Sequence, residues 1–238
     1  LGLVNNLFSK RAKVIACGTW PTLTSQSTNK IFTGNPVRSR IMKRRGSPYI
    51  PPGDYPMSIL VIGGSQGANI LSKVVPDALS CLPKSILKSL RVSHQARLED
   101  TSGVVESYDD LEIKSVVKPF FNDIENRYAE AQLVISRAGA SSVADISIIG
   151  RPSILIPFAG ALADHQMANA KPLKENGGAI VLQESKVSPK SLAKAIEKVL
   201  MSPDLAKKMA DNALKNGNPE ATKKIYEVLL SIIEVEKE

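Results

Sequence analysis

Short runs of apolar, often β-branched residues alternate with helical patterns from Met57 onward. The runs have the length of buried strands, and turn-forming residues separate them from the helical segments. The predicted strands are Ser58–Ile62, Leu90–Ser93, Ile113–Val117, Leu133–Ser136, Ser153–Pro157 and Ala179–Gln183, and the predicted helices between them are 68–81, 122–131, 141–149 and 166–175. This alternation indicates an α/β fold with a doubly wound parallel sheet.

The pattern is different on either side of this region. After Gln183 it becomes helical, because proline at a first turn and glycine just past an end mark helix boundaries. The predicted helices are Ser188–Met201, Pro203–Lys215 and 219–235. Before Met57 we expect a strand at Lys13–Ala16 and a stiff, extended connector at Pro48–Pro56, which is rich in proline.

The composition excludes several classes of protein. With 43% hydrophobic and 23% charged residues in 238, the chain can bury a sizeable core. The two cysteines, Cys17 and Cys81, exclude a disulfide framework and fit a cytoplasmic setting. The longest apolar run, Ile154–Ala163, is far shorter than the ~20 residues of a membrane-spanning helix.

The net charge of +8 suggests an anionic partner, which leaves nucleic acid, phosphorylated metabolites and acidic lipid surfaces open. Five cations gather between Arg38 and Arg45, a pattern more typical of solvated surface than of a binding site. Nucleic acid is disfavoured because aromatic residues are not interleaved with the cations. His94 and His165 lie far apart in sequence, and no spacing indicates a metal site or a catalytic nucleophile.

Three loops that suit a ligand are predicted at the carboxyl edge of the sheet, where open α/β sheets bind ligands. Gly63–Gly67 lies between a strand and a helix, so it can bind a phosphate, or Ser65 can simply cap the helix. It is neither a dinucleotide-binding nor a P-loop sequence. The third loop, Ala159–Gln166, offers His165 and Gln166 to sugar hydroxyls, with a solvated helix start as the alternative.

The second loop, Arg137–Asp145, is built from small residues that let a ligand approach the backbone. Ser142 and Asp145 have the spacing of a capping box. Asp145 can accept hydrogen bonds from both vicinal hydroxyls of a ribose, because a carboxylate has two oxygens. Equally, a carboxylate in the first turn can balance the helix dipole.

Five motifs then occur in the order and approximate spacing found in one family. They are Thr33-Gly34-Asn35-Pro36-Val37-Arg38, GGSQGA at 63–68, RAGASSVADI at 137–146, Pro157-Phe158 and DHQMANA at 164–170. On these residues the chain resembles the MurG family, the UDP-N-acetylglucosamine: undecaprenyl-pyrophosphoryl-muramoyl-pentapeptide N-acetylglucosaminyltransferases of bacterial peptidoglycan synthesis. The resemblance extends over essentially the whole chain.

The resemblance implies a Rossmann-like C-terminal half of a GT-B glycosyltransferase. Its activity would be inverting transfer of N-acetylglucosamine from UDP-N-acetylglucosamine to lipid I, giving lipid II for the cell wall, with no cofactor or metal. The expected partners are this donor, lipid I through a missing domain, and an anionic membrane surface at the cytoplasmic face of the inner membrane, but no nucleic acid. The alternatives are a non-catalytic UDP-sugar-binding fragment and a related transferase with another acceptor.

The resemblance also carries over site residues. Arg38 would sit near the donor diphosphate, which Ser65 binds, and Phe121 would contact uracil through its backbone. Asp145 would take the ribose hydroxyls, although many relatives have Glu there, and Gln166 with His165 would read the sugar hydroxyls. The full UDP-sugar-binding set is Arg38, Gly64, Ser65, Gln66, Phe121, Ala140, Ser141, Ser142, Val143, Asp145, His165 and Gln166.

The same resemblance divides the chain. Residues 1–35 would be a remnant of the N-terminal acceptor domain, 36–56 the basic, proline-rich linker, 57–218 the donor-binding domain, and 219–238 a helix that returns to the N-terminal domain. The family's N-terminal glycine-rich loop and histidine-bearing segment have no counterpart, so we expect no catalytic residue in this chain and no transfer by the chain alone. The apolar stripe from Ile225 to Ile233 should then be partly exposed and favour self-association.

Overall fold

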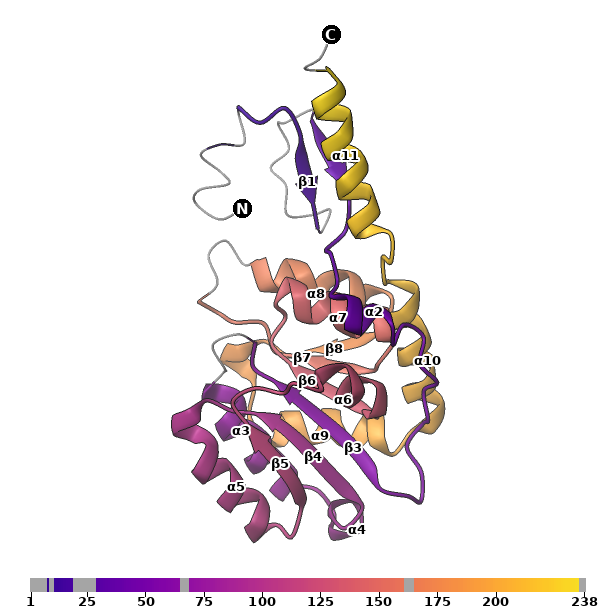
Figure 1. Ribbon diagram of the computed structural model, residues 1–238. Helices are drawn as coiled ribbons and strands as arrows, with labels where there is room; N and C mark the ends of the chain where they lie inside the picture. The colour runs from indigo at the N-terminus through magenta and orange to yellow at the C-terminus, as the bar shows by residue number, and fades with distance from the viewer. Residues whose placement is uncertain (1–7, 9–10, 19–28, 65–68, 161–164, 236–238) are drawn as a thin grey trace.

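A six-stranded parallel sheet forms the centre of the protein across the residues that the computed structural model describes, which are 8, 11–18, 29–64, 69–160 and 165–235. The strands are β3 (Met57–Ile62), β4 (Leu90–Gln95), β5 (Lys114–Lys118), β6 (Leu133–Ser136), β7 (Ser153–Leu155) and β8 (Ala179–Val181). All six predicted strands are confirmed, and the order β5-β4-β3-β6-β7-β8 is that of a doubly wound sheet (Figure 1).

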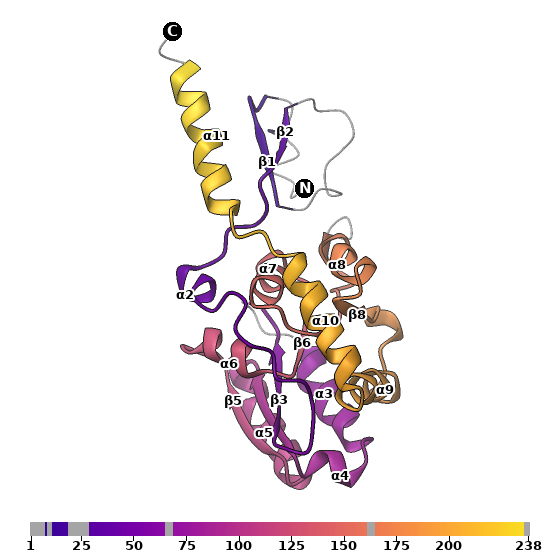
Figure 2. The same cartoon turned by 90° about the vertical axis from the view of Figure 1, so that its right-hand side faces the viewer.

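Helices cover both faces of the sheet (Figures 1 and 2). One face carries α3 (Asn69–Ser80), α4 (Lys84–Leu87), α5 (Thr101–Asp110) and α9 (Pro189–Leu200), and the other carries α2 (Ser39–Met42), α6 (Ile124–Glu130), α7 (Ala140–Ile149) and α8 (His165–Glu175). Side chains of β3 alternate between the two cores, Ile59 and Val61 in one and Leu60 and Ile62 in the other. Because both faces of the strand are covered, Ile59–Ile62 forms an uninterrupted apolar run.

Helix boundaries agree with the sequence where capping chemistry is strong. Ser188 caps α9 and forms a capping box with Ser191, and α10 (Pro203–Lys215) begins at a proline. The helix α5 was not expected, because Gly103 and the neighbouring small polar residues have weak helix propensity. Packing of Val104 and Tyr108 into the core overrides that preference.

The strand order reverses at β3, which pairs with β4 on one side and with β6 on the other. The helix after β3, α3, packs on one face of the sheet, and the helix after β6, α7, packs on the other. A crevice therefore opens between the carboxyl ends of β3 and β6. The topology alone therefore places a ligand site at this point.

Outside the sheet, β1 (Ile15–Cys17) pairs in parallel with β2 (Lys30–Phe32). This pair and α11 (Ala221–Val235) extend from the same end of the molecule (Figures 1 and 2). The Nδ2 amide of Asn218 donates to the Thr33 carbonyl at 2.9 Å and joins the two connecting segments. On α11, Leu229 and Ile233 are about half exposed, as expected for the apolar stripe from Ile225 to Ile233. Self-association through this stripe remains a prediction.

Arg151 joins three segments of the domain while being completely buried. Its guanidinium donates to carbonyls that end α6 and α7 and to carbonyls of the segment that follows α2. The acceptors are Ser47, Pro48, Tyr128, Ala129, Ile149 and Gly150. Burial lowers the pKa of Arg151 to about 10, and nearby Tyr49 raises it, so the side chain stays charged at neutral pH. The planar fork of donors suits this set of acceptors.

We predict that Arg151→Met lowers the free energy of unfolding by about 3 kcal/mol or more, because several buried carbonyls lose their donor. Chemical denaturation measures the change. Arg44→Met is the matched control, since the Arg44 side chain bonds to Asn126 at the surface. Equal stability of the two variants would contradict this role for Arg151.

Candidate active site

A cavity of about 590 Å³ lies at the predicted crevice. Its size falls within the ~300–1,000 Å³ of small-molecule sites. The wall comes from the ends of β3, β4 and β5, from α6 and α7, and from the segment before α2. The lining residues are Pro36, Arg38, Ile62, Gly64, Gln95, Pro119, Phe120, Phe121, Ile124, Tyr128, Ser141, Ser142 and Asp145.

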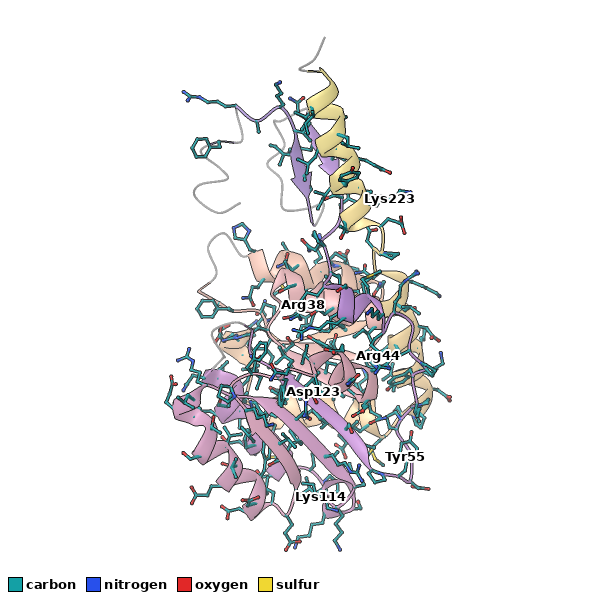
Figure 3. The ribbon with its side chains drawn as sticks, in the orientation of Figure 1. Arg38, Arg44, Tyr55, Lys114, Asp123 and Lys223 are labelled. Atoms are coloured by element: carbon teal, nitrogen blue, oxygen red, sulfur yellow. The ribbon has the colours of Figure 1, made fainter. Side chains whose placement is uncertain are left out.

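Arg38 and Asp145 form the charged centre of this cavity. Arg38 Nη2 donates to Asp145 Oδ2 at 2.8 Å, and the Asp145 side chain is 6% exposed against 50% for Arg38. Figure 3 shows Arg38 close to α2 and α7. Burial raises the pKa of Asp145, and the hydrogen bond and charge of Arg38 oppose that rise. The second carboxylate oxygen can still accept a hydrogen bond from a ligand.

The start of α7 supplies backbone donors beside that pair. Gly139 is the N-cap residue, so Ala140, Ser141 and Ser142 begin the helix and their N–H groups belong to its first turn. Such N–H groups favour an anion. Ser142 lies inside the helix, so the predicted capping box with Asp145 is wrong. Asp145 is in the second turn, which also excludes its role as a first-turn carboxylate balancing the dipole.

The opposite end of the cavity is mostly apolar. Phe121 is 3% exposed, and the Arg127 guanidinium lies 4.2 Å from its ring centroid. Arg127 in turn donates to Ser93 and Asp123, which hold it over the ring. Gln95 Nε2 donates to the Pro119 carbonyl at 3.1 Å and fixes the turn before Phe121. This wall suits a flat, weakly polar ring, with backbone groups of the turn available for hydrogen bonds.

The predicted sugar-reading residues lie beyond this cavity. Gln166 Oε1 accepts from the backbone N–H groups of Ala138 and Phe158 at 3.2 and 3.0 Å. The oxygen is therefore occupied within the protein, and the amide Nε2 is the group that can donate to a ligand. His165 begins α8. Among the described residues, the lining of the cavity includes neither of these two side chains.

The cavity brings together half of the predicted binding set. Its lining contains Arg38, Gly64, Phe121, Ser141, Ser142 and Asp145. Ala140 is exposed at the start of α7, and Val143 packs in the core and lines a second cavity of about 300 Å³ on the far side of α7. Ser65 and Gln66 lie outside the described residues.

Sequence reasoning missed the part of the wall formed by α6 and the ends of β4 and β5. Ile124 and Tyr128 are one helical turn apart and face the cavity, a spacing that periodicity could have identified. Gln95 and Pro119 gave no signal, because their role depends on strand pairing that the sequence does not show.

Within the ranges that the structure describes, no group of three or more His, Cys, Asp or Glu side chains could hold a metal ion. In the same part of the chain, no helix is long and apolar enough to cross a membrane.

Comparison with known proteins gives consistent results. The family model of the glycosyltransferase family 28 C-terminal domain matches residues 58–225. Curated UDP-N-acetylglucosamine--N-acetylmuramyl-(pentapeptide) pyrophosphoryl-undecaprenol N-acetylglucosamine transferases of Rhizobium meliloti (strain 1021) and Chelativorans sp. (strain BNC1) are 42% and 41% identical over 94% and 98% of this chain. The chain spans 60% and 62% of the length of these relatives.

Solved structures agree. The crystal structure of MurG from Acinetobacter baumannii is 30% identical with a TM-score of 0.78, covering 97% of this chain and 64% of that one. The kitacinnamycin glycosyltransferase covers 91% of this chain and 55% of its own at a TM-score of 0.60. Its 16% identity makes it similar in fold alone.

We predict that Arg38→Met raises the pKa of Asp145 further, because the buried carboxylate loses its hydrogen-bonded cation. Carboxyl carbon shifts followed by NMR against pH measure the change. Arg44→Met, on the same segment but bonded to Asn126, should leave the Asp145 titration in place. An unchanged Asp145 pKa in Arg38→Met would contradict the pairing.

Proposed function

The chain belongs to the glycosyltransferase family 28 C-terminal domain family, and from that premise we propose that it binds UDP-N-acetylglucosamine as the donor half of an N-acetylglucosaminyltransferase. The complete enzyme would transfer the sugar to lipid I and form lipid II in peptidoglycan synthesis. The names of the relatives, and the MurG structure that resembles the chain, support this substrate pair.

One observation carries the proposal: the cavity is apolar at one end, holds a buried carboxylate in the middle, and borders a helix N-terminus. These three parts match uracil, ribose and diphosphate in the order in which they occur in UDP. Uracil would lie against Phe121 and Ile124, with the backbone of the turn reading its edge. The ribose hydroxyls would donate to Asp145, and the diphosphate would meet the first N–H groups of α7 and the loop after Gly64.

The Arg38–Asp145 pair fits this arrangement. Asp145 is one methylene shorter than the Glu of many relatives, and Arg38 holds its carboxylate through Oδ2. Oδ1 would then accept from the ribose. Because Arg38 is half exposed, its guanidinium can also approach the diphosphate and oppose the negative charge that develops as UDP leaves.

The reaction we propose is a direct displacement with inversion. The C4 hydroxyl oxygen of the acceptor bonds to the anomeric carbon of the donor while the bond from that carbon to the UDP oxygen breaks. The hydroxyl proton passes to a general base, and the electron pair of the broken bond stays on UDP. We infer that the base and the acceptor site belong to the part of the relatives that this chain does not span.

The domain division follows the same proposal. Residues 57–218 would form the donor-binding domain, while 1–35 and 219–238 would belong with the acceptor half. The segment 36–56 would connect the two, and it is anchored to the donor domain by Arg151 and by Tyr49, whose hydroxyl donates to the Gln132 carbonyl at 2.9 Å. The net charge of +8 supports a peripheral association with an anionic membrane at its cytoplasmic face.

We predict that the isolated chain binds UDP and UDP-N-acetylglucosamine in isothermal titration calorimetry and transfers no sugar. Asp145→Asn should weaken UDP binding by about tenfold or more, because a charge-assisted hydrogen bond contributes roughly 1.5–3 kcal/mol. Asp211→Asn is the control, since it removes a carboxylate paired with Lys207 on the surface of α10.

Two outcomes would oppose the proposal. A chain that is folded by circular dichroism but shows no UDP binding would remove the donor-binding role. Turnover of lipid I by the chain alone would overturn the assignment of the base to another part of the enzyme.

A further inference from the structure

Glu184 lies outside every motif of the sequence, yet both of its carboxylate oxygens are engaged. It follows β8, at the start of a short turn of 3₁₀-helix (Glu184–Lys186). Oε1 accepts from Arg137 Nη2 at 2.6 Å, and Oε2 accepts from the Ala159 backbone N–H at 2.6 Å. The side chains of Arg137 and Glu184 are only 10% and 18% exposed, so the pair is shielded from solvent.

Arg137 links the end of β6 to the loop that follows β7. It directly follows β6, and its Nη1 donates to the Ile156 carbonyl, just past β7, at 3.1 Å. Its guanidinium also lies 5.2 Å from the ring centroid of Phe158. Arg137 and Glu184 together therefore contact the loop after β7 at three points, the Ile156 carbonyl, the Phe158 ring and the Ala159 N–H.

Gln166 ties the same loop to the start of α7. Its Oε1 accepts from Ala138 in the loop after β6 and from Phe158 in the loop after β7. These contacts leave its Nε2 as the donor toward a ligand. The position of that amide thus depends on the loop that Glu184 holds.

The sheet order tells which part of a donor this loop would meet. The 590 Å³ cavity begins at the ends of β5 and β4 and reaches α7, which follows β6. Uracil, ribose and diphosphate would occupy that stretch in order. The next strand is β7, so the group beyond the diphosphate would lie over the loop after β7.

We propose that Glu184 is a positioning residue for the sugar moiety of the donor, an inference that rests on the proposed donor-binding function. It acts through the Ala159 N–H and through Arg137, and it fixes the Phe158–Ala159 loop against the start of α7. The sugar hydroxyls would then hydrogen-bond to backbone groups of this loop, which are already in position, and to the Gln166 amide. Burial raises the pKa of Glu184, but the hydrogen bonds from Arg137 and Ala159 outweigh it and lower the pKa, which keeps the pair charged at neutral pH.

The test compares two ligands that differ only by the sugar. Glu184→Gln keeps the shape of the side chain but turns an amide N–H₂ toward one of the two donors that the carboxylate accepts. We expect UDP affinity to change by less than about twofold and UDP-N-acetylglucosamine affinity to fall by about fivefold or more, since one charged hydrogen bond is lost. Asp211→Asn, which breaks a surface ion pair on α10, should change neither affinity.

A second measurement uses the wild-type chain and needs no variant. In NMR spectra, UDP-N-acetylglucosamine should shift the backbone amides of Phe158 and Ala159 and the side-chain amide of Gln166, whereas UDP should leave them nearly unchanged.

The outcomes separate this inference from the function beneath it. If the wild-type chain binds neither ligand, the proposed function fails and this inference fails with it. If it binds UDP, the function stands. The inference is then overturned by equal wild-type affinities for the two ligands, by equal losses for both in Glu184→Gln, by no loss at all, or by equal NMR shifts with both ligands.

Discussion

The reversal of strand order at β3 is the constraint on which the rest of this structure depends. The strand β3 pairs with both β4 and β6, and the helices that follow β3 and β6 go to opposite faces of the sheet. An open crevice therefore lies between the carboxyl ends of β3 and β6. A cavity of about 590 Å³ occupies that crevice. The wall of this cavity comes from the ends of several strands, from α6 and α7 and from the segment before α2, so the site follows from the fold rather than from one long motif.

Buried polar residues turn this topology into a fixed geometry. The helices α6 and α7 supply Tyr128 and Asp145 to the cavity, and the segment before α2 supplies Arg38. Arg151 donates to carbonyls of α6, of the end of α7 and of the segment after α2. Glu184 with Arg137 does the same for the loops after β6 and β7. In both places a charged side chain satisfies backbone groups where the chain turns, which fixes the position of those turns.

The sequence predicted the sheet well, because its central strands β3, β6 and β7 are almost entirely buried and stand out as apolar runs. The sequence did not predict α5, because Gly103 and the neighbouring small polar residues have weak helix propensity. The helix depends instead on packing of Tyr108 into the core. For the site, motif residues such as Arg38 and Asp145 were expected separately, and only the fold shows that they bond to each other. Glu184 could not be found, because its partners come from segments 25 and 47 residues away.

The central claim is that the crevice holds a UDP-sugar in one orientation, with the base toward β5 and the sugar toward β7. A crystal structure of the chain with UDP-N-acetylglucosamine tests it most directly. The account predicts uracil against Phe121, a ribose hydroxyl within hydrogen-bond distance of Asp145, and the diphosphate at the start of α7. A nucleotide bound in the reverse orientation, or away from Asp145, would contradict it.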